Sequence, residues 1–145
     1  MSDLRKQVEQ FVKQELMKAG LEVFASESEN RGVDFIIKTP SGKYHELFLQ
    51  PINLDFTRSV KIPKNDLGEL KDNLWIVLVF VMKGMEPVLH LIASKVLQSP
   101  DNYIFFEHEQ GERFKHLSNW EIKVFQKGIG ELSKYSLTSM ISKLG

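Results

Sequence analysis

The sequence contains no cysteine, which excludes disulfides, thiolate metal sites and cysteine nucleophiles. It also has no excess of charge, because 19 lysines and arginines balance 19 acidic residues. No net field therefore draws the whole molecule to nucleic acid or to an anionic membrane. Any nucleic-acid binding has to rest on a local patch.

Long apolar runs are missing as well. The longest, residues 74–82, is shorter than the roughly 20 residues that span a bilayer, and the first residues do not form a signal peptide. The length of 145 residues and the hydrophobic content of 42% fit one domain over residues 1–145. Together with the lack of cysteine, this predicts one soluble cytoplasmic domain without a membrane segment.

Hydrophobic spacing predicts a helix over residues 3–19. A β-hairpin is predicted next, because residues 33–39 and 44–50 are rich in strand formers and flank a turn at 40–43. Pro51 cannot donate a ladder hydrogen bond, so the second strand should end or reach a sheet edge there. Further strands are predicted over residues 21–25, 74–82, 87–92 and 103–107.

Other parts of the chain carry weaker signals. Residues 53–73 look irregular apart from one helical turn near residues 67–70, and residues 93–97 fit a short helix. Helical spacing returns over residues 130–144, with Gly128 and Gly130 predicted to form the turn before it. The order of elements predicts an α/β fold, bordering on α+β, with a central mixed sheet flanked by helices.

A group of acids near the start of the chain has the order of a known active-site scaffold. Glu9 and Glu15 lie on the predicted first helix, and Asp34 stands at the start of the predicted hairpin. This arrangement resembles the PD-(D/E)XK superfamily, which has a restriction endonuclease-like core, and small bacterial proteins with that core. The resemblance implies that Asp34 is the metal-binding aspartate and that a helical acid assists it.

The next strand should then carry Glu or Gln, any residue, and Lys. Such a site hydrolyses a phosphodiester with a divalent cation held by oxygen ligands, while the lysine stabilises charge or positions water. Matching by position after the turn places Phe48 at the motif position of the metal ligand and Gln50 at the motif position of the lysine. Phe48 offers no oxygen and Gln50 no charge, which leaves Asp34 and the Leu49 carbonyl.

Two rearrangements could restore activity. Sliding the motif back by two residues makes Glu46 the ligand, but Phe48 then takes the lysine position. Lys38 shares a strand face with Asp34, yet it lies about 13 Å along the strand at roughly 3.3 Å per residue. The alternative of an active magnesium-dependent nuclease therefore needs a rearranged site.

Structural explanations exist for the same acids. Asp34 can be a partly buried acid that pairs with Lys38 or Arg31, and Glu15 can pair with a basic side chain from the sheet. Arg58, Lys61 and Lys64 form a locally basic stretch that could meet a phosphate backbone.

Residues 107–109, Glu-His-Glu, superficially suggest a metal site. Alternation along a strand points His108 away from both acids, which argues against that site. His45 and His90 lie in strand patterns without an acid and serine arrangement, so no hydrolase triad is predicted.

The sequence predicts an inactive nuclease-like domain with a binding role, no cofactor, and nucleic acid or protein as its partner. An active nuclease would instead use Mg²⁺. The third hypothesis is a protein–protein module such as a homodimer, which a patch of exposed Tyr44, Phe48 and Trp120 would favour.

Overall fold

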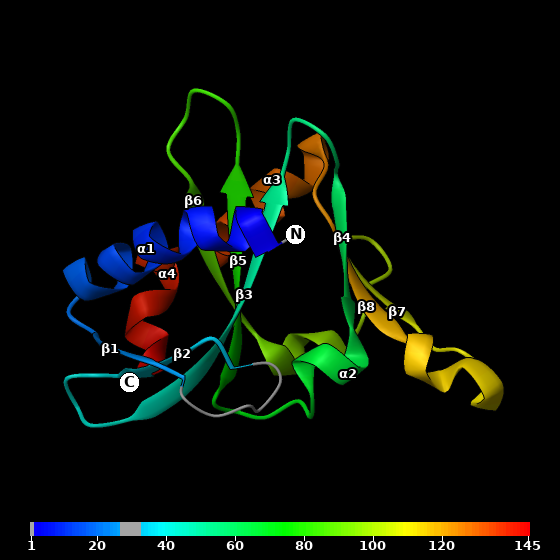
Figure 1. Cartoon of the computed structure of the whole chain (residues 1–145), viewed down its shortest axis with the longest axis horizontal. Helices are drawn as coiled ribbons and strands as arrows, with labels where there is room; N and C mark the ends of the chain where they lie inside the picture. Colours follow the sequence, from blue (N-terminus) through cyan, green and yellow to red (C-terminus); the bar gives the residue numbers. More distant parts are fainter. Residues whose placement is uncertain (1, 27–32) are drawn as a thin grey trace.

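The computed structural model describes residues 2–26 and 33–145, which form two β-sheets with helices around them (Figure 1). The larger sheet has five strands in the order β1-β2-β3-β5-β6. These strands are β1 (Glu22–Ala25), β2 (Phe35–Lys38), β3 (Tyr44–Asn53), β5 (Leu74–Val81) and β6 (Val88–Ala93). Strands β3 and β5 are parallel, while the other neighbouring pairs are antiparallel. The predicted central mixed sheet is therefore confirmed.

A second, antiparallel sheet has three strands in the order β4-β8-β7. Its strands are β4 (Ser59–Pro63), β8 (Asn119–Lys123) and β7 (Phe105–His108). The prediction of an irregular segment over residues 53–73 is thus wrong. Val60 and Ile62 of β4 face inward opposite Ile122 and Trp120, a pairing across about sixty residues that no local pattern reveals.

The predicted helical turn at residues 67–70 lies three residues earlier, as α2 (Lys64–Leu67). It ends at Gly68, whose φ of +80° is a conformation that glycine adopts without a steric cost. The predicted short helix at residues 93–97 is the 3₁₀ helix η1 (Ser94–Gln98). A second 3₁₀ helix, η2 (Glu112–Leu117), leads into β8.

The end of the chain differs from the single helix predicted over residues 130–144. It is broken into α3 (Gln126–Leu132), η3 (Ser133–Tyr135), α4 (Leu137–Met140) and η4 (Ile141–Leu144). The break falls at Ser136, whose side chain accepts a hydrogen bond from the Ser139 N–H and caps α4. Gly128 and Gly130 were predicted to form a turn, but both lie inside α3. At Gly128 the helix passes close to the Phe125 ring, which lies 3.4 Å from where a Cβ would be.

Helix α1 (Ser2–Lys18) crosses one face of the larger sheet, and α4 lies beside it (Figure 1). Val8, Val12 and Leu16 form the buried side of α1. The other face of the sheet packs against the smaller sheet, so β5 is buried on both faces. None of the helices in the described part of the chain is long and apolar enough to cross a membrane.

Candidate functional site

Asp34 lies at the point where β2 separates from β3. The first paired residues are Phe35 and Leu47, and β3 continues to Asn53 with β5 as its only neighbouring strand among the described residues. The Asp34 N–H donates to the Leu47 carbonyl over 2.8 Å, so the backbone is still aligned with β3 there. Extending the register by one residue places Asp34 opposite Phe48. This opening between two strands positions the candidate site.

The Asp34 carboxylate is already occupied by two donors from the protein. Its Oδ2 accepts a hydrogen bond from the Leu49 N–H at 2.7 Å and another from the Arg5 guanidinium at 2.5 Å. The side chains of Arg5 and Asp34 are each about one-third exposed, at 34% and 31%. In the bond from Leu49, the Asp34 carboxylate takes the place of a backbone carbonyl from a neighbouring strand. The bond from Arg5 brings a permanent cation from α1 to the carboxylate.

Arg5 is held on a second side by an aromatic ring. Its guanidinium carbon lies 5.2 Å from the centre of the Phe48 ring, within the range of a cation–π contact. Phe48 is only 6% exposed, as expected for a core residue. The residue opposite Asp34 therefore presents a ring face to a guanidinium, where a metal ligand would present oxygen.

Asp34 is a partly buried acid with a basic partner, as one explanation predicted, and that partner is Arg5. The predicted partner Lys38 instead lies over the ring of Tyr44, with its Nζ 5.6 Å from the ring centre, while the prediction of Arg31 falls outside the described residues. The sequence did contain a signal for Arg5. It precedes Val8 by three residues, so it belongs to the same buried helical face.

Gln50, at the position expected for lysine, folds back on its own strand. Its Nε2 donates to the Pro51 carbonyl over 3.0 Å. Pro51 lies on a free edge as predicted, because β2 has already separated and β5 pairs with the opposite edge of β3. Gln50 supplies no positive charge to Asp34.

The two helical acids do not reach Asp34. Glu9 is exposed, and the Glu15 carboxylate pairs with the Lys18 ammonium at 3.2 Å. The expected partner of Glu15 from the sheet is thus wrong, since the partner lies one turn later in the same helix. Glu15 follows Arg5 by ten residues, which is about 15 Å along a helix.

The donor set around Asp34 does not fit a divalent cation. Mg²⁺ requires several oxygen ligands, whereas Asp34 is bonded to a guanidinium and faces an aromatic ring. Across residues 2–26 and 33–145 there is no cluster of three or more histidine or acidic side chains that could hold a metal ion.

A groove of about 850 Å³ borders this site. The residues that line it come from the start of α1, the free edge of β3, the following loop and β4: Leu4, Arg5, Gln7, Gln50, Pro51, Ile52, Asn53, Phe56, Thr57 and Val60. None of these described lining residues is acidic, and half of them are apolar. Phe56 stands out, because 87% of it is exposed.

The three basic residues predicted to contact nucleic acid have different environments. Arg58 and Lys61 are exposed. Lys64 instead bonds to Glu107 at 2.5 Å and to Glu109, and its ammonium lies 4.3 Å from the centre of the Trp120 ring. Burial alone would lower the pKa of Lys64, but the two carboxylates outweigh it and raise the pKa. The charge of Lys64 is therefore used inside the protein.

The sequence around His108 behaves as strand alternation predicts. Glu107 and Glu109 both point to Lys64, while His108 points the other way and its Nε2 lies 2.7 Å from Glu121 Oε1. Burial tends to raise the pKa of Glu121, but its bonds to His108 and Ser59 lower it overall. Glu107 and Glu109 thus pair with Lys64, while Glu121 is bonded separately to His108.

Comparison with known proteins supports the fold. No protein-family model and no curated protein sequence matches the chain. Among solved structures, the Holliday junction resolvase of the archaeal hyperthermophile Archaeoglobus fulgidus is similar, with a TM-score of 0.51 and 10% identity over 81% of this chain and 82% of that chain. That resolvase belongs to the PD-(D/E)XK superfamily, so the restriction endonuclease-like fold predicted here is confirmed.

Proposed function

We propose that this chain is a nuclease-fold domain that does not cleave, and that it binds nucleic acid in the groove beside Arg5 without a divalent cation. The observation that carries the proposal is the contact of the Arg5 guanidinium with Asp34 Oδ2. A guanidinium neutralises the carboxylate, but it cannot activate a water molecule as a bound metal does.

The chemistry of hydrolysis lacks its other parts as well. Phosphodiester cleavage needs stabilisation of the charge that develops on the phosphate oxygens. Phe48 cannot ligate a metal, and Gln50 is bonded to the Pro51 carbonyl. These losses support a domain that has kept the scaffold and not the reaction.

Nucleic acid is the partner that the groove favours. Its described lining contains no acid, and the exposed Arg58 directly follows the lining residue Thr57. The similar solved structure is a Holliday junction resolvase, a protein that acts on branched DNA by its name. That similarity supports the class of ligand and nothing finer.

The alternative of an active nuclease finds no support in the rearrangements considered. Glu46 forms an ion pair with Lys71 at 2.8 Å, and Lys38 lies over Tyr44. Both side chains are thus held away from Asp34.

An exposed patch with Tyr44, Phe48 or Trp120 would have favoured the protein–protein hypothesis. Tyr44 is 54% exposed, but Phe48 and Trp120 are 6% and 8% exposed. Phe48 and Trp120 therefore add nothing to an exposed patch, and the exposed Phe56 keeps a protein partner as an outcome to be tested.

The test combines cleavage, metal binding and ligand binding. We expect no cleavage of single-stranded, duplex or four-way-junction DNA or RNA with Mg²⁺ or Mn²⁺, and equal affinity for nucleic acid in EDTA and in Mg²⁺ at matched ionic strength. A metal site with a Kd of roughly 1 mM would add about 1.4 kcal/mol of stability at about 10 mM metal. We expect no such thermal shift.

Cleavage that disappears in the Asp34→Ala variant would show that the proposal is wrong about catalysis. Failure of every nucleic acid to bind would show that it is wrong about the ligand.

A further inference from the structure

The side chain of Phe56 is held in solvent by an ordered turn. The N–H groups of Phe56 and Thr57 both donate to the Asn53 carbonyl over 3.1 Å, and Asp55 N–H donates to Asn53 Oδ1. The Asp55 carboxylate in turn accepts the Lys83 N–H from the β5–β6 hairpin at 2.8 Å. A turn tied at both ends loses little further entropy on binding, so Phe56 is a pre-organised anchor.

The groove beside this anchor is unsuited to a phosphate on its floor. The positive charge of Arg5 is balanced by Asp34, and the lining residues around it include Leu4, Pro51 and Ile52. Transferring a phosphate anion to such an apolar surface is costly without a paired cation. In a metal-dependent nuclease the phosphate must come to the metal, whereas here the floor offers no net charge to attract it.

The polar groups in the lining suit the edges of bases. Gln7, Asn53 and Gln50 contribute side-chain amides, each with an acceptor oxygen and an NH₂ donor. Asn53 Oδ1 and Gln50 Nε2 are already engaged, which leaves the Asn53 NH₂ and the Gln50 oxygen as complementary donor and acceptor. Groups of this kind recognise the hydrogen-bonding edges of unstacked bases.

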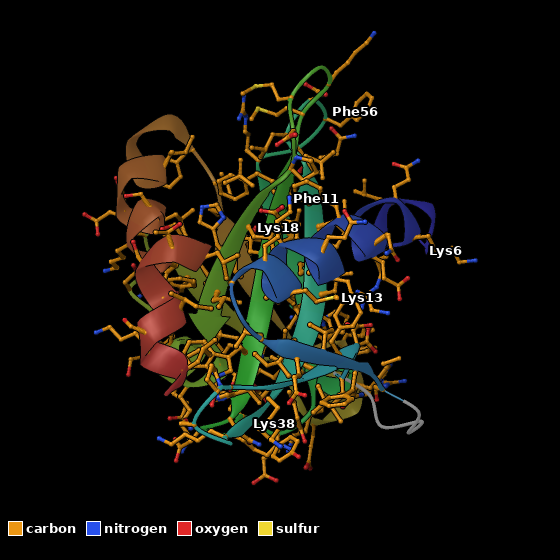
Figure 2. The ribbon with its side chains drawn as sticks, turned by 90° about the vertical axis from the view of Figure 1, so that its left-hand side faces the viewer. Lys6, Phe11, Lys13, Lys18, Lys38 and Phe56 are labelled. Carbon is orange, nitrogen blue, oxygen red and sulfur yellow. The ribbon has the colours of Figure 1, made fainter. Side chains whose placement is uncertain are left out.

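Positive charge lies outside the groove. Lys6 and Arg58 are exposed, and each is adjacent in sequence to a lining residue. The exposed Asp55 also lies next to Phe56, but its carboxylate accepts the Lys83 N–H. Lys61 follows the lining residue Val60 in β4, so it projects from the other face of that strand. Figure 2 shows Lys6 projecting from the N-terminal end of α1 and Phe56 on the loop after β3. Charge complementarity thus favours phosphates along the rim.

We infer that the groove takes unpaired bases of a single-stranded nucleic acid, with one base stacked on Phe56 and the phosphates outside at Lys6 and Arg58. This inference rests on the proposed function, because it assumes that nucleic acid occupies the groove. Base stacking on an exposed aromatic side chain is tolerant of sequence and does not require a metal.

The experiment measures fluorescence anisotropy in EDTA with three labelled probes of equal length. The probes are an oligothymidylate, an abasic backbone of the same charge, and a duplex. We expect the oligothymidylate to bind at least about tenfold more tightly than the other two, and Phe56→Ala to weaken it by about 5- to 100-fold. Phe56→Trp should keep the affinity, because it keeps the stacking surface.

Phe114→Ala is the matched control, since Phe114 is 51% exposed on η2 and does not line the groove. It should leave all three affinities unchanged. Equal binding of the abasic probe, or an unchanged affinity in Phe56→Ala, would overturn the inference.

The pattern of failure separates the two proposals. If all probes bind equally and the Lys6→Ala/Arg58→Ala double variant loses them, the proposed function stands and the base groove is wrong. If no probe binds and sedimentation shows a dimer that Phe56→Ala dissociates, the occupant is a second copy, and both proposals are wrong about the ligand.

Discussion

Replacing Asp34 by alanine is expected to destabilise the folded protein, because one carboxylate oxygen serves both the Arg5 guanidinium and the Leu49 N–H. The alanine variant leaves both donors without this acceptor. Asparagine keeps an oxygen for the Leu49 N–H and removes only the negative charge. The two variants therefore separate the hydrogen bond from the ion pair.

The magnitude follows from the two contacts. An N–H that loses its acceptor in a partly buried position costs about 1–3 kcal/mol. An ion pair whose side chains are one-third exposed is screened by water and contributes about 0–1 kcal/mol. We therefore expect the free energy of unfolding to fall by about 2–3 kcal/mol for Asp34→Ala and by less than about 1 kcal/mol for Asp34→Asn.

Urea unfolding followed by tryptophan fluorescence measures this directly, since Trp75 and Trp120 are both buried. The alanine variant should lower the melting temperature by roughly 5–12 °C for a domain of this size. Arg5→Met should show a coupling with Asp34→Asn in a double-mutant cycle. An ordinary metal site without its cation holds an uncompensated carboxylate, which asparagine would relieve. A stabilising Asp34→Asn with no coupling to Arg5 would therefore refute the reasoning.

Three further predictions concern metal binding, acid stability and a loop anchor. The triple variant Arg5→Ala, Phe48→Glu, Gln50→Lys should gain Mn²⁺ binding in calorimetry. The single variant Arg5→Ala should not bind Mn²⁺, because it frees the Asp34 carboxylate without adding a second ligand. Burial lowers the pKa of His90 below the usual histidine value of about 6.5. Unfolding therefore takes up a proton, and stability should fall as pH drops below about 6.5. His90→Leu should flatten that slope in urea titrations at several pH values. Desolvation alone would raise the pKa of Asp101, but three successive backbone N–H donors at 2.9 Å lower it overall. Because Asp101→Ala leaves these donors without their acceptor, it should lower the free energy of unfolding by about 1–3 kcal/mol in the same assay. An unchanged unfolding midpoint would contradict this role.

The parts of the fold that follow from local pattern were predicted from the sequence. The hairpin of β2 and β3 was found from its strand formers and turn, but the sequence left its register open, and only the structure places Asp34 opposite Phe48 when the register is extended by one residue. Strand β5 was found because it is apolar on both faces. Strand β4 was missed, because its five residues gain their order from β8 about sixty residues later.

The site was predictable only in part, for the same reason. The departures from the motif at Phe48 and Gln50 were visible in the sequence, but the cation that pairs with Asp34 comes from Arg5, 29 residues before it. Its position depends on how the end of α1 docks on the sheet. Local spacing places Arg5 on the buried face of α1 and does not say which acid it meets.

The free edge of β3 gives one more reason to expect recognition by side chains. Glu46 and Leu54 donate their backbone N–H groups toward the β5 side. Backbone groups alternate along a strand, so the N–H and carbonyl groups of Leu49, Pro51 and Asn53 point toward the groove. An extended peptide that added a strand here would need donors and acceptors in regular succession. The Leu49 N–H is already bonded to Asp34. Pro51 has no N–H, and its carbonyl accepts a hydrogen bond from Gln50. The Asn53 carbonyl accepts hydrogen bonds from the N–H groups of the following turn. The edge is thus closed to strand addition over most of its length. A ligand in this groove has to be held by Phe56, the amide side chains and the surrounding cations. A single-stranded nucleic acid has the bases and phosphates to bind all three.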